Sequence, residues 1–370
     1  MKDLVIFLPG TMGSCFRLSV NPSSPARKLW YEDTAKSLSE LVSNPSVFKW
    51  NPHVPMECYE VLSHVQFLFF KRNIYGSLRK ALGSLTDYTY TEFPYDWRED
   101  IRVTAKRLGE WLHLNYAFRV DKEDSLQQQQ QDSRRLILIG HSMGGLVGAL
   151  AVMKGYIHPS NVRKYISVGT PFFGAPVGFK ALCEVGYLPG MSWLNRSMNW
   201  RRDRNKCKQV LLETLRSFPS TYQLLPPITE KFVELKDGRP INPLNNNVLD
   251  ANLCTTANET HLELSKFNEF LMRYPALQAL FIYGDYPSNT DKLYTASVDR
   301  TGRSYTDLSC YKRTHGDGTV PVTSAYIETH TTARMPVVGG SHAYMCADSR
   351  VIELILAYLS VPKGSSAVGS

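Results

Sequence analysis

The feature that most constrains this chain is a serine flanked by glycines, directly after a short apolar run. The run is Leu136-Ile137-Leu138-Ile139, and the motif that follows is Gly140-His141-Ser142-Met143-Gly144. This pattern predicts a strand that turns sharply into a helix, with glycines where the two backbones come close together. Such a turn exposes the hydroxyl of Ser142 and points the amide of Met143 at the same space. We therefore expect Ser142 to be a nucleophile.

Composition allows a large α/β core and favours an anionic partner. The chain has 370 residues, 43% of them apolar, and its 42 basic residues outnumber the 34 acidic ones to give a net charge of +8. This length accommodates one large α/β domain with insertions. No dense run of basic residues interleaved with aromatic ones indicates a nucleic-acid site. We therefore expect no nucleic acid, but peripheral contact with an anionic membrane surface.

The sequence shows no targeting or membrane-spanning segment. No apolar stretch reaches the roughly 18 residues of a membrane helix, and the first apolar run, Leu4–Leu8, is too short for the core of a signal peptide. The seven cysteines are scattered without a C-x-x-C pair, which is typical of free thiols in a reducing compartment. The expected location is cytoplasmic or peripheral to a membrane.

Short apolar runs alternate with helical patterns along the chain. This alternation predicts a mostly parallel sheet with helices on both faces. The expected strands are Leu4–Leu8, Tyr88–Phe93, Leu136–Ile139, Lys164–Val168, Leu280–Tyr283 and Met335–Val338. The expected helices are Ile74–Leu82, Ile101–Leu114, Met143–Met153 and Ser349–Leu359.

A long interval from Phe172 to Ala276 breaks this alternation. An excursion of this length between two strands is better explained by an inserted cap or lid than by a plain loop. We therefore divide the chain into a first part of the core (1–171), a cap/lid insertion (172–276), a second part of the core (277–362) and a flexible tail (363–370).

Two segments are candidates for contact with lipid. The insertion carries a group of aromatic and basic residues, Met191–Leu194, Trp200–Arg202, Arg204, Lys206 and Lys208. Earlier in the chain, Phe67–Phe70 is followed by Lys71 and Arg72, and apolar residues beside cations suit a lipid interface. An ordinary buried segment explains the second pattern equally well.

A serine nucleophile needs a histidine base and a carboxylate that orients the base. In a sheet with such a turn they follow along the chain in the order serine, acid, histidine. Asp317 lies between two glycines, in a loop that can turn its carboxylate inward, and Asp285 is the alternative acid. His342 lies between the last strand and the last helix, where this topology would place a base. His315 and His330 are the alternatives.

The loop after the first strand is a candidate oxyanion hole. Its sequence, Pro9-Gly10-Thr11-Met12-Gly13-Ser14, contains glycines that let a backbone amide face the site. We expect the amides of Thr11 and Met143 to bind the oxyanion together. No histidine, cysteine or carboxylate cluster has the spacing of a metal site, and no glycine pattern indicates a nucleotide, so no cofactor is expected.

Together these motifs resemble the lecithin:cholesterol acyltransferase (LCAT) family, which includes lysosomal phospholipase A2 and the phospholipid:diacylglycerol acyltransferases. The resemblance spans about residues 4–360, and its motifs occur in the family's order. They are Leu8–Ser14, Phe93-Pro94-Tyr95-Asp96-Trp97-Arg98, Ile139–Gly144, Ile166–Pro171, Ile282-Tyr283-Gly284, Gly316–Val320 and His342.

The resemblance implies an α/β-hydrolase fold with a mobile lid in the insertion. It implies a serine-dependent lipid acyl hydrolase or acyltransferase, of phospholipase A or O-acyltransferase type, that takes a phospholipid or another lipid ester. The nucleophile falls on Ser142, the acid on Asp317 and the base on His342, with the oxyanion amides on Thr11 and Met143. We expect neither the signal peptide nor the disulfides of the secreted members in this chain.

Two other functions fit the same motifs. One is a carboxylesterase that acts on small soluble esters. The other is a catalytically silent lipid-binding protein.

Overall fold

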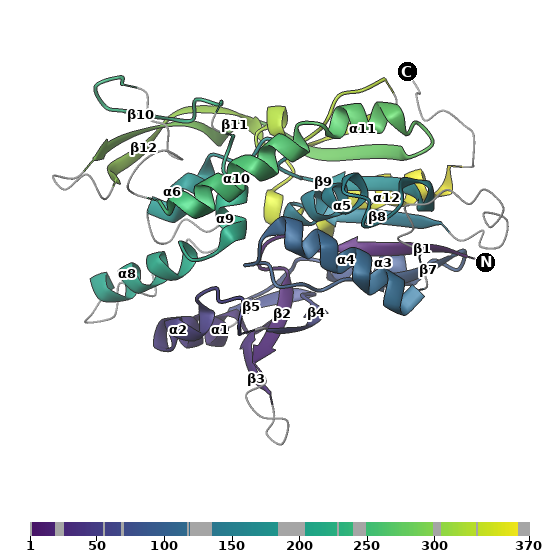
Figure 1. The fold of residues 1–370 in the computed structure, drawn as a ribbon, viewed down its shortest axis with the longest axis horizontal. Helices are drawn as coiled ribbons and strands as arrows, with labels where there is room; N and C mark the ends of the chain where they lie inside the picture. Colours follow the sequence, from purple (N-terminus) through teal and green to yellow (C-terminus); the bar gives the residue numbers. More distant parts are fainter. Residues whose placement is uncertain are drawn as a thin grey trace.

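The strand that precedes Ser142 lies near the middle of a parallel sheet in the computed structural model (Figure 1). The structure describes residues 2–18, 26–54, 56–67, 70–116, 118, 135–183, 204–227, 229–239, 249–298, 305–330 and 332–361. In spatial order the sheet contains β7 (Tyr88–Glu92), β1 (Asp3–Leu8), β8 (Leu136–His141), β9 (Val162–Val168), β11 (Gln278–Val298) and β13 (Thr332–Val338). Every neighbouring pair in this series is parallel. The expected α/β sheet is confirmed.

Strand β1 shows why the central strands read as continuous apolar runs. Leu4, Ile6 and Leu8 point into one hydrophobic cluster, whereas Val5 and Phe7 point into a second cluster on the opposite face. All five side chains are fully buried. A parallel strand covered on both faces needs apolar residues at every position, so it shows no alternation with polar ones.

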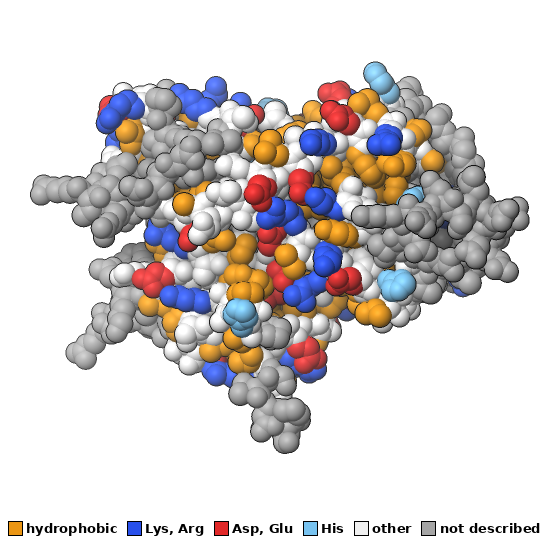
Figure 2. Space-filling model, in the orientation of Figure 1, with side chains coloured by type: hydrophobic (Ala, Val, Ile, Leu, Met, Phe, Trp, Pro, Cys, Tyr) orange, Lys and Arg blue, Asp and Glu red, His pale blue; other side chains and the backbone are white. Residues whose placement is uncertain are grey.

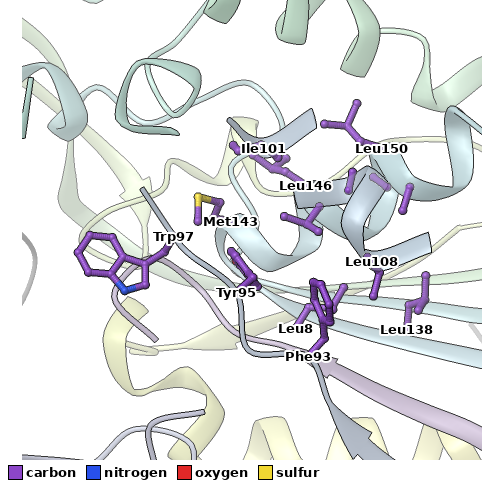
Figure 3. Close-up of a cluster of buried hydrophobic side chains, with 14 of the residues drawn as sticks. Leu8, Phe93, Tyr95, Trp97, Ile101, Leu108, Leu138, Met143, Leu146 and Leu150 are labelled. Atoms are coloured by element: carbon purple, nitrogen blue, oxygen red, sulfur yellow. The ribbon is translucent and has the colours of Figure 1, made fainter. Parts of the chain in front are cut away.

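Helices cover both faces at the places that the sequence predicts. On the side of Leu8 the sheet packs against α4 (Ile101–Tyr116) and α5 (Met143–Met153), and Figure 3 shows Leu108, Leu146 and Leu150 in this layer. On the opposite side lie α3 (Gly76–Gly83) and α12 (Ser349–Ser360). Helix α12 begins where the Asp348 carboxylate accepts a hydrogen bond from the amide of Arg350.

Strand β11 extends far beyond the expected segment Leu280–Tyr283. Its first half lies in the core sheet between β9 and β13. Its outer half, residues 286–298, pairs antiparallel with β12 (Tyr305–Gly316) and parallel with the short β10 (Val233–Leu235). The outer half is polar and its register shifts several times. Its strand geometry therefore depends on pairing that no local pattern reveals.

The described residues of the interval from Phe172 to Ala276 are mainly helical. They form α6 (Val177–Cys183), α8 (Arg204–Leu215), α9 (Pro219–Gln223), α10 (Ala251–Leu264) and α11 (Phe267–Arg273). Helices α6, α9 and α10 join β10, β12 and the outer half of β11 around a separate hydrophobic cluster that contains Phe179, Tyr222 and Tyr294. We call these elements the outer layer. Helix α11 instead belongs to the core, because the ring of Phe267 packs 5.4 Å from that of Tyr165 in β9.

Between β1 and β7 the chain forms an N-terminal insert that no sequence pattern predicts. It contains a small sheet with β2 (Ser14–Leu18) between β3 (Arg27–Trp30) and β4 (Glu57–Val61), helices α1 (Thr34–Ser43) and α2 (Pro45–Phe48), and the hairpin of β5 (His64–Phe67) and β6 (Phe70–Asn73). In Figure 1 this insert lies below the main sheet. Short 3-10 turns occur at η1 (Pro159–Asn161), η3 (Val322–Ser324) and η4 (His342–Ala347).

Some expected features lie outside the described residues. These are Met191–Leu194, Trp200–Arg202, the tip of the Phe67–Phe70 segment and the tail at 363–370. Of the helices that the structure does describe, none has both the length and the apolar character to cross a membrane. On the face in Figure 2, basic and acidic side chains are interspersed. Arg102 of α4 forms an ion pair with Glu259 of α10.

The buried Arg98 ties the N-terminal insert to the core. Its side chain is 1% exposed, and its Nε and Nη2 donate to the Asp96 carboxylate at 2.8 and 2.6 Å. Nη1 donates to the Phe48 carbonyl at 2.9 Å, and the guanidinium lies 5.0 Å from the ring centre of Phe16. The planar guanidinium thus connects α2, β2 and the loop that follows β7.

We expect Arg98→Met to destabilise the protein by about 3 kcal/mol, because it leaves the poorly exposed Asp96 carboxylate without its cation. The midpoint of urea unfolding, followed by circular dichroism, measures this effect. Arg239→Met is the matched control. Arg239 pairs with Asp237 at the same spacing in the chain, but the pair is exposed, so little change is expected. Equal shifts in the two variants would contradict the role given to Arg98.

Candidate active site

Ser142 lies in a strained turn between β8 and α5. Its φ is +52° and its ψ is −125°, a backbone conformation that non-glycine residues rarely adopt. Its amide donates to the Val168 carbonyl of β9 at 2.8 Å, which holds the turn against the sheet. A Cβ atom on Gly140 would lie 2.5 Å from the backbone of Gly145, and one on Gly144 would lie 2.2 Å from the Leu8 carbonyl oxygen. The close approach therefore excludes side chains at both glycines.

The structure brings Ser142, His342 and Asp317 into one hydrogen-bonded row. The Ser142 Oγ lies 2.9 Å from Nε2 of His342, and Nδ1 of His342 lies 2.7 Å from Oδ2 of Asp317. All three residues are less than 9% exposed. The other carboxylate oxygen, Oδ1 of Asp317, accepts from the amides of Thr319 and Val320 at 2.9 and 2.7 Å. Each oxygen of the Asp317 carboxylate therefore has a hydrogen-bond partner that fixes its orientation.

The alternative acid and bases lie elsewhere. Asp285 Oδ1 is 2.7 Å from Nδ1 of His315, and more than a third of the His315 side chain is open to solvent. His330 is exposed. Of the candidates from the sequence, only Asp317 and His342 form hydrogen bonds that lead to Ser142.

Thr11 and Met143 lie close to Ser142, as the glycine-rich loop and the helix start predict. The Thr11 hydroxyl is 3.8 Å from the Met143 sulfur, and Met143 is the first residue of α5. Within the described part of the chain, neither of the two backbone amides donates to a protein acceptor. Both N–H groups can therefore donate a hydrogen bond to a bound ligand.

Aromatic side chains hold the loop that contains Thr11. The Tyr95 hydroxyl donates to the Pro9 carbonyl at 2.5 Å, and the Trp97 indole donates to the Ser14 carbonyl at 3.3 Å. The Trp30 indole donates to the Met12 carbonyl at 2.9 Å, and the Tyr75 hydroxyl accepts from the Gly10 amide at 2.9 Å. Tyr95 and Trp97 belong to the Phe93–Arg98 block, but no motif singles out Trp30 or Tyr75.

A largely apolar pocket of about 230 Å³ opens beside Ser142. The N-terminal insert contributes residues to it, among them Trp30, Leu62, Val65 and Ile74. The segment from Pro171 to Leu224 contributes Ala175, Val177, Gly178 and Ala181. The pocket suits an apolar group of a ligand with its reactive bond at Ser142.

The imidazole of His141 is held in its neutral form. Its two nitrogens lie 2.8 Å from the Tyr75 hydroxyl and 3.0 Å from the His342 carbonyl oxygen. Burial, together with the nearby charge of His342, lowers the pKa of His141 from 6.5 to about 3. Among the described residues, no group of three histidine, cysteine or carboxylate side chains is arranged to hold a metal ion.

Comparisons with known proteins identify the fold and a group of relatives. A family model described as "PGAP1-like alpha/beta domain" matches residues 3–188, about half of the chain. A model of the alpha/beta hydrolase fold matches residues 118–295. The chain is 23% identical over 313 residues to "Phospholipase A(1) LCAT3" of Arabidopsis thaliana. That match covers 73% of this chain but 65% of the relative, so the chain spans less than two thirds of that protein.

A solved structure shares this fold along nearly the whole chain. A chain in the crystal structure of the Tle4–Tli4 complex has a TM-score of 0.60 at 12% identity, covering 96% of this chain and 98% of that one. The mature Bacillus licheniformis lipase BlEst2 has a TM-score of 0.44 at 11% identity, with 97% and 93% covered. The expected α/β-hydrolase fold is confirmed.

The buried His141 predicts a loss of stability in acid. The unfolded chain takes up a proton on this residue near pH 6.5, whereas the folded chain resists protonation down to about pH 3. Stability is therefore fully present above pH 6.5 and falls as the pH approaches 3. His141→Gln should lack this contribution, so the wild type should lose up to about 1.4 kcal/mol per pH unit more than the variant.

Urea unfolding of both proteins at a series of pH values between about 6 and 4 measures this difference. The difference between the two curves cancels other titrating groups, such as His261, whose pKa burial lowers to about 4. Parallel curves would contradict the prediction.

Proposed function

The chain belongs to the PGAP1-like α/β-domain family, and from that premise we propose that it is a serine-dependent acyl hydrolase or acyltransferase that acts on lipid esters. The observation that carries the proposal is the row from Ser142 through His342 to Asp317, with contacts of 2.9 and 2.7 Å. A serine on a strained turn that lines a pocket, a histidine within reach and a buried carboxylate behind it are the parts that acyl transfer requires.

In the proposed reaction, Ser142 Oγ attacks the ester carbonyl while His342 Nε2 takes its proton. The Asp317 carboxylate holds the imidazole in orientation and stabilises the imidazolium that forms. The amides of Thr11 and Met143 bind the oxyanion. His342 then returns the proton to the leaving alcohol, which leaves an acyl group on Ser142. Water or the hydroxyl of a lipid alcohol then attacks this acyl group while His342 accepts its proton, and His342 passes that proton to Ser142 Oγ as the bond between Oγ and the acyl carbon breaks.

The apolar pocket supports a lipid ester as substrate. Its lining beside Ser142 offers few polar groups to recognise a small polar ester, and its apolar residues come from both the N-terminal insert and the interval after β9. The relative from Arabidopsis thaliana is named a phospholipase A(1), and the sequence motifs resemble the LCAT family. We therefore include phospholipids among the substrates.

The interval 172–276, apart from the core helix α11, is proposed to act as a cap. Ala175, Val177, Gly178 and Ala181 line the pocket from within it. Its helices α6, α9 and α10 pack around a cluster of their own in the outer layer. The net charge of +8 supports peripheral contact of the protein with an anionic membrane.

Ser142→Ala should abolish turnover, with a loss of at least about 10³-fold, because it removes the nucleophile. Vesicles of phosphatidylcholine with a sterol and a diacylglycerol are the substrate, and mass spectrometry of the lipid products is the measurement. Free fatty acid indicates hydrolysis, whereas sterol ester or triacylglycerol indicates acyl transfer. A fluorophosphonate probe should label the wild type but not the variant, and Ser84→Ala, at an exposed position, is the control.

Two outcomes would overturn this proposal. A wild type that the probe does not label would indicate a silent lipid-binding protein. Turnover of short monomeric esters without any turnover of vesicles would indicate a carboxylesterase.

Asp317→Asn should lower kcat by roughly 10³–10⁴-fold, because the amide favours the wrong orientation and tautomer of His342. Asp285→Asn is the matched control, since Asp285 also pairs with a histidine but lies outside the row. Its kcat should stay within about twofold of the wild type. The two values come from the same vesicle assay, and a larger loss from Asp285→Asn would assign the acid to that residue instead.

A further inference from the structure

A second row of hydrogen bonds runs behind the first, from the loop of Thr11 to the backbone of His342. The Gly10 amide lies 2.9 Å from the Tyr75 hydroxyl. The same hydroxyl lies 2.8 Å from Nδ1 of His141, and Nε2 of His141 lies 3.0 Å from the His342 carbonyl oxygen. These three contacts connect segments that are 65, 66 and 201 residues apart in the chain.

Only one arrangement of protons gives every donor in this row an acceptor. The Gly10 amide can only donate, so the Tyr75 oxygen accepts there and its own proton points to His141. Nδ1 of His141 must then accept, which places the ring proton on Nε2, where it donates to the His342 carbonyl. All three hydrogen bonds are therefore donated in the same direction, from Gly10 toward His342. This arrangement leaves one proton on the His141 ring, which is neutral.

The row is buried and tightly packed. Tyr75 and His141 are 2% and 4% exposed. The Tyr75 ring packs at 5.0 Å from Phe7 and 5.5 Å from His141, and the His141 ring lies 5.1 Å from that of His342. In such surroundings each of these hydrogen bonds is costly to lose, because water cannot replace the missing partner.

The row also fixes the backbone of His342, the proposed base. The amide of His342 donates to the Asp317 carbonyl at 3.0 Å, and its carbonyl accepts from His141. The backbone of His342 is thus held at both its donor and its acceptor, while its ring contacts Ser142 and Asp317. At the other end, Gly10 immediately precedes Thr11.

We propose that Tyr75 and His141 are positioning residues that keep the oxyanion loop and the His342 base in register with Ser142. This inference rests on the proposed function, since it assigns the two residues a part in the same acyl transfer. Both residues line the pocket beside Ser142, but the proton of Ser142 passes to His342 and to neither of them. They act by holding the Thr11 amide and the His342 ring where the transition state needs them, which affects kcat more than substrate binding.

Tyr75→Phe is the sharpest test, because it removes one oxygen and keeps the ring that packs on Phe7. It leaves both the Gly10 amide and Nδ1 of His141 without their partner. We expect kcat on phosphatidylcholine vesicles to fall roughly tenfold or more, while KM stays within about twofold. Tyr294→Phe is the matched control. Tyr294 is also buried and its hydroxyl donates to Asp291 in the outer layer, so its kcat should not change.

Two substitutions of His141 test the two contacts separately. In His141→Gln the side-chain amide reaches about as far as Nε2 and can still donate to the His342 carbonyl. In His141→Asn the amide reaches only as far as Nδ1, so it can accept from Tyr75 but cannot reach His342. We expect Gln to keep more of kcat than Asn. Equal values for both, or a greater loss with Gln, would contradict the hold on His342.

Histidine ring nitrogen shifts in ¹⁵N NMR provide a readout that needs no turnover. His141 should carry its proton on Nε2 and stay neutral at about pH 5.5, which lies above its pKa of about 3 but below the ordinary histidine value of 6.5. A proton on Nδ1, or a charged ring at this pH, would overturn the inference even if the protein had no esterase activity. Unchanged kcat in Tyr75→Phe, with an active wild type and inactive Ser142→Ala, would overturn the inference and leave the proposed function intact.

Discussion

The left-handed backbone of Ser142 is the constraint on which the rest of the site depends. Such a conformation costs roughly 1–3 kcal/mol for a residue with a side chain, and the surrounding structure imposes it here. The amide of Ser142 is bound to Val168, and α5, whose residues 143–152 are buried, starts at the next residue. Because Gly140 and Gly144 lack side chains, β8, α5 and the end of β1 can meet around this one turn.

The loop that faces Ser142 has little structure of its own. It contains two glycines and a Met12 with φ of +63°, so its shape comes from its partners. Indole and phenol groups of Trp30, Tyr75 and Tyr95 bind its backbone and bury their rings around it. An aromatic side chain with a polar tip is well suited to this, because it binds one backbone group and excludes water from the others. The rigidity that an oxyanion hole requires is therefore built from outside the loop.

The sequence predicts the parts of this structure that local patterns control. Strands buried on both faces, such as β1 and β8, read as continuous apolar runs, and α5 has the predicted bounds because its turn and its apolar residues are both explicit. The order of Ser142, Asp317 and His342 along the chain is also local information, and the structure places the three together, although their roles stay proposals.

Other parts depend on contacts between distant segments. The outer half of β11 is polar and is held by β12 and β10. The small sheet of the N-terminal insert consists of short strands with few buried residues to mark them. Tyr75 is an ordinary residue in its own segment and gains its importance from Gly10 and His141, which lie 65 and 66 residues away. Only the folded chain brings these partners together.

The long hairpin of β11 and β12 has a further consequence for the acid. Asp317 follows the last residue of β12, so its position is reached by a chain that leaves the core sheet along β11, crosses the outer layer and returns. The outer layer therefore lies on the path of the chain between the core sheet and Asp317. The amide of Gly318 donates to Thr290 of β11, which anchors the returning chain where it re-enters the core. The pairing of β11 with β12 thus sets the point at which Asp317 enters the site.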